Sequence, residues 1–149
     1  MTAPPTRYEV EARIVGPGVS EAACRASRIA FDSSPGRSPD LPGPAELLAS
    51  AFAACLLKNV ERFSEMLPFR HAGASVRVTA EREDHPPRFA RIRYELRVVT
   101  DEEPRRVELL HTNLRKYGTV YNTLAATCDV SGDLIAAPAP AIHAGGERA

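Results

Sequence analysis

One uninterrupted stretch decides the fold: residues 44–67 read PAELLASAFAACLLKNVERFSEML. The stretch is rich in alanine and leucine, which are the strongest helix formers. Pro44 suits the first position of a helix, and Glu46 places negative charge near the positive end of the helix dipole. Pro68 follows and cannot continue the pattern. We therefore predict one long helix from Pro44 to about Leu67.

The two halves of this helix differ in polarity. Its first half is apolar on nearly every side, and charges appear only from Lys58 onward. A helix that is hydrophobic all round is buried on all sides. A chain of 149 residues encloses such a helix with difficulty. A second subunit is therefore expected to complete its cover.

The residues before the helix favour strands. Residues 8–14 alternate between apolar and charged side chains, which predicts a half-buried strand. Gly16, Pro17 and Gly18 signal a turn, so residues 21–32 are expected to return as a hairpin partner. Residues 33–44, SSPGRSPDLPGP, form a loop rich in proline, glycine and serine.

The residues after the helix predict a second pair of strands. Residues 76–81 and 91–98 both alternate, and HPPR at 85–88 turns between them. This pattern indicates an antiparallel pair with one solvent-facing side. TDEEP at 100–104 then introduces a second helix that stops at Gly118.

The element order indicates an α+β fold in one domain. A last strand is expected over residues 123–135. We assign residues 1–7 to an N-terminal extension, 8–135 to the domain and 136–149 to a mobile C-terminal tail.

Composition excludes several classes of function. The formal net charge is zero, with 19 basic and 19 acidic residues, so no nucleic-acid partner is expected. No apolar run approaches the ~20 residues of a membrane span. The N-terminus lacks the layout of a secretory signal, so we expect a cytoplasmic protein. Three scattered cysteines predict neither a disulfide scaffold nor a metal site.

Cys55 is the candidate reactive residue. It lies where the apolar half of the helix meets the charged half, and Lys58 and Asn59 follow at i+3 and i+4. Helical side chains lean toward the N-terminus, so both lean toward the sulfur. A cation there would favour the nucleophilic thiolate. Arg62 lies about 10 Å further along the axis and could contribute only field. The alternative is that Cys55 fills a gap in the core while the Lys58 ammonium stays in solvent.

Glu46 is a second catalytic candidate. Nine residues separate it from Cys55, roughly 14 Å of helical rise and half a turn out of phase. The two side chains cannot touch within one continuous helix. The alternative role for Glu46 is that of an acid favoured in the first turn.

Residues 43–55, GPAELLASAFAAC, resemble the start of the central helix in the OsmC/Ohr family of osmotically inducible and organic hydroperoxide resistance proteins. The family pattern is Gly or Asn, Pro, a variable residue, Glu, a run rich in Leu and Ala, then Cys. The likeness spans about residues 8–135. It implies antiparallel sheets packed on a long central helix, in an intertwined homodimer with two sites at the subunit interface.

The resemblance also implies a chemistry. In the peroxidase members the helix Cys attacks a hydroperoxide and becomes a sulfenic acid, and a second Cys then closes a disulfide that thiol reductants reopen. Cys55 matches the attacking Cys. The family often reads Tyr-Cys-Pro/Ser-Val at the second position, whereas this chain reads KYGTVYNTL at 116–124. Gly118 thus stands where the resolving thiol would be, and an external thiol is expected to resolve the sulfenic acid.

Other family features are only partly matched. Cys128 and Cys24 fall in expected strands, where packing is the main interpretation and resolution of the sulfenic acid stays open. The first strand turn lacks the Arg of the peroxidase branch; Arg25, Arg28 and Arg37 are the candidates that remain. The Glu–Cys spacing of that branch is one residue longer, so Glu46 suits the less-characterised OsmC-like branch.

Two functions are therefore weighed. The first is a cysteine-based peroxidase, a peroxiredoxin-like oxidoreductase of the oxidative stress response that acts on organic hydroperoxides or hydrogen peroxide without a metal or organic cofactor. The second is a non-catalytic dimer whose interfacial apolar pocket binds a small hydrophobic ligand, with Cys55 as lining. Tyr117 and Tyr121 have a core role as their alternative, because aromatic residues at a helix end more often belong to the core. The candidate binding residues are Asn59, Tyr117, Gly118, Tyr121 and Asn122.

Overall fold

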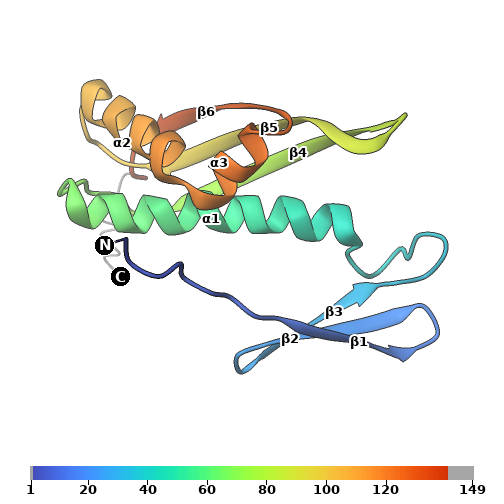
Figure 1. Cartoon of the computed structure of the whole chain (residues 1–149). Coiled ribbons are helices and arrows are strands. Elements are labelled where there is room, and N and C mark those ends of the chain that lie inside the picture. The colour runs from blue at the N-terminus through green and yellow to red at the C-terminus, as the bar shows by residue number, and fades with distance from the viewer. Residues whose placement is uncertain (1, 141–149) are drawn as a thin grey trace, which may run out of the picture. The chain divides into compact units, whose positions relative to one another are not determined.

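A three-stranded antiparallel meander opens the chain in the computed structural model, which describes residues 2–140 (Figure 1). The chain divides into two compact units, one ending at Leu48 and the other starting at Ala49. The strands of the first unit are β1 Glu11–Gly16, β2 Val19–Cys24 and β3 Ser27–Asp32. Most of the predicted tail, 141–149, lies outside the described residues.

The first unit differs from the prediction in two respects. The first strand starts at Glu11, and the apolar residues of the predicted strand 8–14 are not half-buried within the single chain: Val10, before β1, is 59% exposed and Ile14, within it, 78%. The predicted return strand 21–32 is two strands, joined by a tight turn in which Arg25 takes a positive φ of 55°. That turn contains neither Gly nor Pro, so the sequence gives no signal for it.

Hydrogen bonds order the loop between β3 and the long helix. The Asp32 carboxylate accepts bonds from the hydroxyl and backbone N–H of Ser34 and from the N–H of Ser38. These bonds, the Ser34 hydroxyl first, hold the pKa of Asp32 below its usual value. The loop predicted over 33–44 is confirmed up to the start of the helix.

The long helix α1 runs from Pro44 to Met66, as the sequence predicts. Its first backbone bond joins the Leu47 N–H to the Gly43 carbonyl at 3.0 Å. The Glu46 carboxylate accepts a bond from the Gly43 N–H at 3.1 Å, which is the reciprocal half of a capping box. Glu46 therefore satisfies a free donor at the helix start.

The second unit contains β4 Ala74–Asp84, β5 Pro87–Val99, α2 Pro104–Tyr117, α3 Thr119–Ala125 and β6 Asp129–Ala137. The antiparallel β4–β5 pair is confirmed. However, β6 joins β5 in parallel, so this sheet, of order β4-β5-β6, is mixed rather than wholly antiparallel. A parallel neighbour needs a crossover, and α2 and α3 supply it (Figure 1).

Helix α3 is a correction to the sequence prediction, which assigned residues 123–125 to the last strand. A single residue, Gly118, separates the end of α2 from the start of α3, and β6 begins only at Asp129. Residues 119–125 are β-branched and aromatic in part, and seven residues are too few to reveal a helical period. The α+β class is unaffected.

The core lies in the second unit. Alternate residues of β5 face the helices and are buried, which confirms the predicted periodicity. Of the intervening residues, Arg91, Glu95 and Arg97 are exposed and Arg93 is half-buried. Gly132 of β6 lies opposite Tyr94, and a Cβ there would lie 2.3 Å from the Tyr94 carbonyl oxygen. Only glycine permits this approach. The core residues include Phe52, Leu56, Val60, Phe63, Ile92, Tyr94, Leu96, Val98, Leu110, Leu114 and Tyr121.

Within residues 2–140, no helix is long and apolar enough to cross a membrane.

Candidate active site around Cys55

Cys55 lies on α1 within the second unit, and its side chain is half-buried. Asn59 follows one turn later and is only 8% exposed. Its side-chain Nδ2 donates a hydrogen bond to the Cys55 Sγ, with a donor–acceptor distance of 3.6 Å. The i, i+4 spacing that the sequence shows thus gives a direct contact. The sulfur is partly accessible and has a buried polar partner.

Gly118 lies against the same sulfur. A Cβ at Gly118 would lie 3.4 Å from Cys55 Sγ, and 2.9 Å from both the Leu114 carbonyl oxygen and the Tyr121 Cβ. The φ of Gly118 is −73°, which any residue adopts. Glycine is therefore required by close packing rather than by backbone conformation. The α2–α3 connection closes over Cys55 at the residue that the resemblance aligned with the resolving thiol.

The cations near this part of α1 make no described contact with the sulfur. Lys58 is exposed and makes no ion pair or hydrogen bond with the residues that the structure describes. The Arg62 guanidinium lies over the Phe63 ring, 5.5 Å from its centroid. Activation of the sulfur by Lys58 remains a prediction.

An aromatic cluster lies one turn before Cys55. Phe52 packs edge-on against Tyr94 and tilted against Tyr121, with both centroids at 5.7 Å. The Tyr94 hydroxyl and His111 Nε2 are hydrogen-bonded at 2.6 Å. Burial, then the positive charge of Arg115, lowers the pKa of His111, and burial raises that of Tyr94. Tyr121, a predicted binding residue, is thus part of the core.

Sequence reasoning did not single out His111. The sequence feature that indicates it is its position on the apolar stripe of α2, next to Leu110 and between the buried Val107 and Leu114. A histidine on such a stripe needs a hydrogen-bond partner. The partner, Tyr94, is distant in sequence.

Tyr117 and Asn122, the other predicted binding residues, lie at the junction of α2 and α3. Tyr117 is 48% exposed and packs tilted against Phe63, with ring centroids 5.6 Å apart. The Lys116 ammonium lies 5.1 Å from the Tyr117 ring centroid. Asn122 donates its side-chain N–H to the Lys116 carbonyl at 3.1 Å, which satisfies the end of α2. A structural role accounts for Asn122.

Glu46 has its described contacts within the first unit. Its carboxylate pairs with the Arg37 guanidinium at 2.9 Å, besides the bond from Gly43. Backbone N–H groups, its own first and then that of Gly43, lower the pKa of Glu46, and Arg37 adds to this effect. Arg37, Glu46 and the loop between them line a hollow of about 470 Å³. Of the three arginine candidates, Arg37 is the one that pairs with Glu46, whereas Arg28 pairs with Glu21.

A family model described as OsmC-like protein matches residues 37–132, which include Cys55, Asn59 and Gly118. This chain belongs to the OsmC-like family. The resemblance stated from residues 43–55 is confirmed. Comparison with curated proteins gives no match for this OsmC-like chain.

Solved structures show the same fold at low identity. An OsmC-like protein from Mycoplasma pneumoniae matches with a TM-score of 0.78 and 17% identity, over 89% of this chain and 97% of that one. An organic hydroperoxide resistance protein OsmC from Legionella pneumophila gives 0.69 and 14%, over 88% and 99%. The organic hydroperoxide resistance protein OhrB of Bacillus subtilis gives 0.63 and 14%, over 87% and 98%. The predicted α+β, OsmC-like fold is therefore confirmed.

The other thiols of this OsmC-like chain are free. Cys128 precedes β6, and its thiol donates to the Leu124 carbonyl at 3.1 Å while the side chain packs against the core. Packing, the main interpretation of this residue, accounts for its position. Cys24 ends β2 in the first unit. Among residues 2–140, no group of three or more potential ligands could hold a metal ion.

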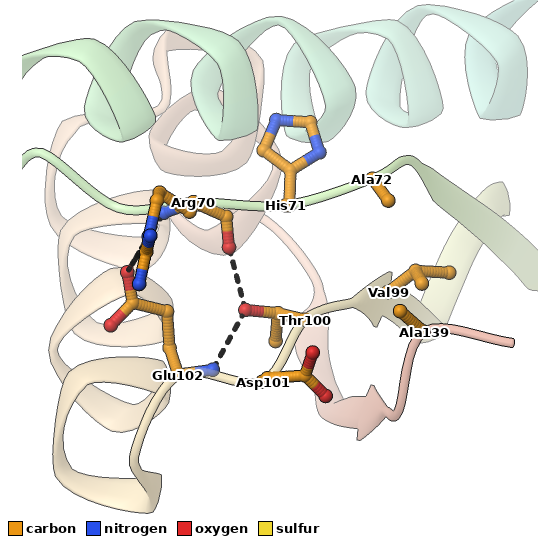
Figure 2. Close-up of a pocket in the computed structure, with 8 residues that line it drawn as sticks. All are labelled: Arg70, His71, Ala72, Val99, Thr100, Asp101, Glu102 and Ala139. Atoms are coloured by element: carbon orange, nitrogen blue, oxygen red, sulfur yellow. Dashed lines mark hydrogen bonds and ion pairs between the residues drawn. The ribbon is translucent and has the colours of Figure 1, made fainter. Parts of the chain in front are cut away.

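A separate pocket of about 290 Å³ lies where α1 leads into β4 and β5 into α2 (Figure 2). The Thr100 hydroxyl donates to the Arg70 carbonyl at 2.6 Å and accepts the Glu102 N–H at 3.1 Å. His71 turns toward α1, with its Nε2 3.4 Å from a Glu61 carboxylate oxygen. Thr100 and His71 thus interact with other protein groups. Cys55 is not among the residues that line this pocket.

Proposed function

We propose that this OsmC-like protein is a cytoplasmic, homodimeric, thiol-dependent peroxidase that reduces organic hydroperoxides or hydrogen peroxide through Cys55. The observation that carries the proposal is a half-buried cysteine on α1 whose sulfur accepts a hydrogen bond from the buried Asn59. Reactive cysteines occupy partly exposed positions whose surroundings favour the thiolate. The names of the Legionella and Bacillus proteins point to the same class of substrate.

The oxidation step follows from thiolate chemistry. The Cys55 thiolate attacks the terminal oxygen of the hydroperoxide; an S–O bond forms and the O–O bond breaks. The leaving alkoxide takes a proton from solvent and departs as the alcohol. Sulfur loses two electrons, the peroxide gains them, and Cys55 becomes a sulfenic acid.

An external thiol completes the cycle. It attacks the sulfenic sulfur, which releases water and leaves a mixed disulfide on Cys55. A second thiol then releases the disulfide of the reductant and restores the Cys55 thiol. Gly118 carries no thiol, and the Cys128 thiol is bonded to the Leu124 carbonyl, so neither residue is assigned the resolving role.

Dimerisation is part of the proposal. The cross-strand rows Ala12–Ala22–Ile29 and Ile14–Ser20–Phe31 share one face of the first sheet. On this face Ile14 and Ile29 are 78% and 44% exposed in the single chain, whereas Ser20 is buried. Exposed apolar side chains gathered on one face are typical of a protein interface. We expect light scattering to give a particle of twice the chain mass. A monomer at micromolar concentration would contradict this part of the proposal.

The catalytic claim is tested by trapping the sulfenic acid. The reduced protein is treated with one equivalent of cumene hydroperoxide in the presence of dimedone, and the labelled peptide is located by mass spectrometry. Rapid, stoichiometric labelling at Cys55 is expected, and the Cys55→Ser variant should show none. Cys24→Ser and Cys128→Ser should still label and should turn over with an added monothiol.

The competing function has a distinct outcome in this experiment. The alternative is a non-catalytic dimer whose interfacial apolar pocket binds a small hydrophobic ligand, with Cys55 as part of the lining. Labelling no faster than that of free cysteine would favour the non-catalytic binding protein and reject the peroxidase.

A further inference from the structure

Asn59 occupies a position that helix stability does not explain. Asparagine is among the poorer helix formers, because its short amide competes for backbone hydrogen bonds. A buried carboxamide also loses its bonds to water unless the protein replaces them. Asn59 is nevertheless buried in the middle of α1, on the side of the helix that carries Leu56, Val60 and Phe63 into the core.

The contact that Asn59 makes is directed at the sulfur. An i+4 side chain leans back along the helix, which brings Nδ2 within 3.6 Å of Cys55 Sγ. A thiolate accepts hydrogen bonds and donates none, whereas a neutral thiol is a weak acceptor. An N–H donor fixed at this distance therefore stabilises the thiolate more than the thiol.

No charged group of the second unit takes this place in the structure as described. On α1, Lys58 is exposed and the Arg62 guanidinium lies over Phe63. On α2, the Lys116 ammonium lies over the Tyr117 ring. Gly118, at the junction of α2 and α3, brings only backbone against the sulfur.

We propose that Asn59, rather than Lys58, sets the reactive form of Cys55. Its carboxamide favours the thiolate and restricts the sulfur to one orientation ahead of the attack on peroxide. The inference rests on the proposed function for its role in turnover. The electrostatic effect on the sulfur can be measured without turnover.

The test uses the full chain with Cys24 and Cys128 replaced by serine, so that the pH dependence of the iodoacetamide alkylation rate reports the titration of Cys55 alone. Asn59→Leu removes the hydrogen-bond donor and introduces an apolar side chain of similar size. We expect the titration midpoint of Cys55 in this variant to rise by about one pH unit. A hydrogen bond to a charged acceptor is stronger than one to a neutral acceptor by about 1 kcal/mol, and one pH unit corresponds to about 1.4 kcal/mol. The second-order rate with cumene hydroperoxide at neutral pH should fall roughly tenfold and should recover at high pH.

Two further variants separate electrostatics from packing. Asn59→Asp keeps the size but replaces the donor by an acceptor, so its midpoint should rise above that of Asn59→Leu. Ser64→Ala is the control on the same helix: the Ser64 hydroxyl is buried and has no hydrogen-bond partner within residues 2–140. Its midpoint and rate should equal those of the parent, and thermal melts establish that each variant is folded.

The outcomes are separable. Unchanged midpoints in folded Asn59→Leu and Asn59→Asp would overturn the inference, even if the parent proved to be a fast peroxidase. Raised midpoints with a parent that reacts no faster than free cysteine would support the role of Asn59 and reject the proposed function. A rate deficit in Asn59→Leu that persists at high pH, with an unchanged midpoint, would assign Asn59 to packing alone.

Discussion

Replacement of Gly118 by alanine tests the closure of the α2–α3 junction over Cys55. The added methyl group would lie 2.9 Å from the Leu114 carbonyl oxygen and from the Tyr121 Cβ, so backbone has to move. Overpacking of this kind costs about 1–3 kcal/mol. Because φ at Gly118 is −73°, alanine should also restrict the unfolded chain and return about 0.4–1 kcal/mol. We therefore expect a net loss of roughly 1–2 kcal/mol in the free energy of unfolding.

Urea unfolding of the Cys55→Ser form measures this loss without interference from the nearby thiol. Gly36→Ala is the matched control, since a Cβ at Gly36 meets nothing within 4 Å and its stability should be unchanged or slightly higher. In the protein that retains Cys55, the shifted junction should also alter the rate of iodoacetamide alkylation. A Gly118→Ala variant as stable as the parent, with unaltered alkylation, would refute the close approach of Gly118 to the sulfur.

Three further predictions follow from the site and its surroundings. Burial lowers the pKa of His111 from 6.5, so as the pH falls the unfolded chain takes up a proton at this residue before the folded chain does. The free energy of unfolding should therefore fall as the pH drops below about 6.5. Urea unfolding between about pH 8 and 5 should show this dependence on pH, and His111→Gln should weaken it. Lys58→Met should move the Cys55 titration midpoint by less than Asn59→Leu does, and the small effect should vanish at about 1 M salt, because exposed charges are screened; an equal shift that salt leaves intact would restore Lys58 as the activating group. Gly132→Ala forces a methyl group onto the backbone of Tyr94 and should destabilise the protein by about 3 kcal/mol, seen as a lower melting temperature; a melting temperature equal to that of the parent would show that β6 does not press on Tyr94.

The sequence predicts best those features that repeat over many residues. The helix from Pro44 and the alternation of β5 extend over several periods, so both were predicted within a few residues of their ends. Helix α3 is too short to show a period, and Arg25 turns the chain without a glycine or proline. The prediction of wholly antiparallel sheets was wrong for β6, because strand polarity depends on the crossover before the strand rather than on its composition.

The site divides along the same line. The contact between Cys55 and Asn59 follows from helical spacing alone. The approach of Gly118 to the sulfur joins distant segments, and only the family resemblance pointed to it. The bond between Tyr94 and His111 also links distant residues, and no motif marks it.

The parallel pairing of β5 and β6 has a consequence for the order of assembly on the ribosome. β4 and β5 are neighbours in sequence and can pair as soon as both have left the ribosome. The other edge of β5 has no partner until α2, α3 and β6 have been synthesised. Until Ala137 is translated, that edge presents unpaired amides beside apolar side chains, which is the template that aggregating chains recruit. A growing chain of this protein is thus most prone to aggregation late in translation. Once β5 is paired on both edges, its amide protons should be the last to exchange with solvent.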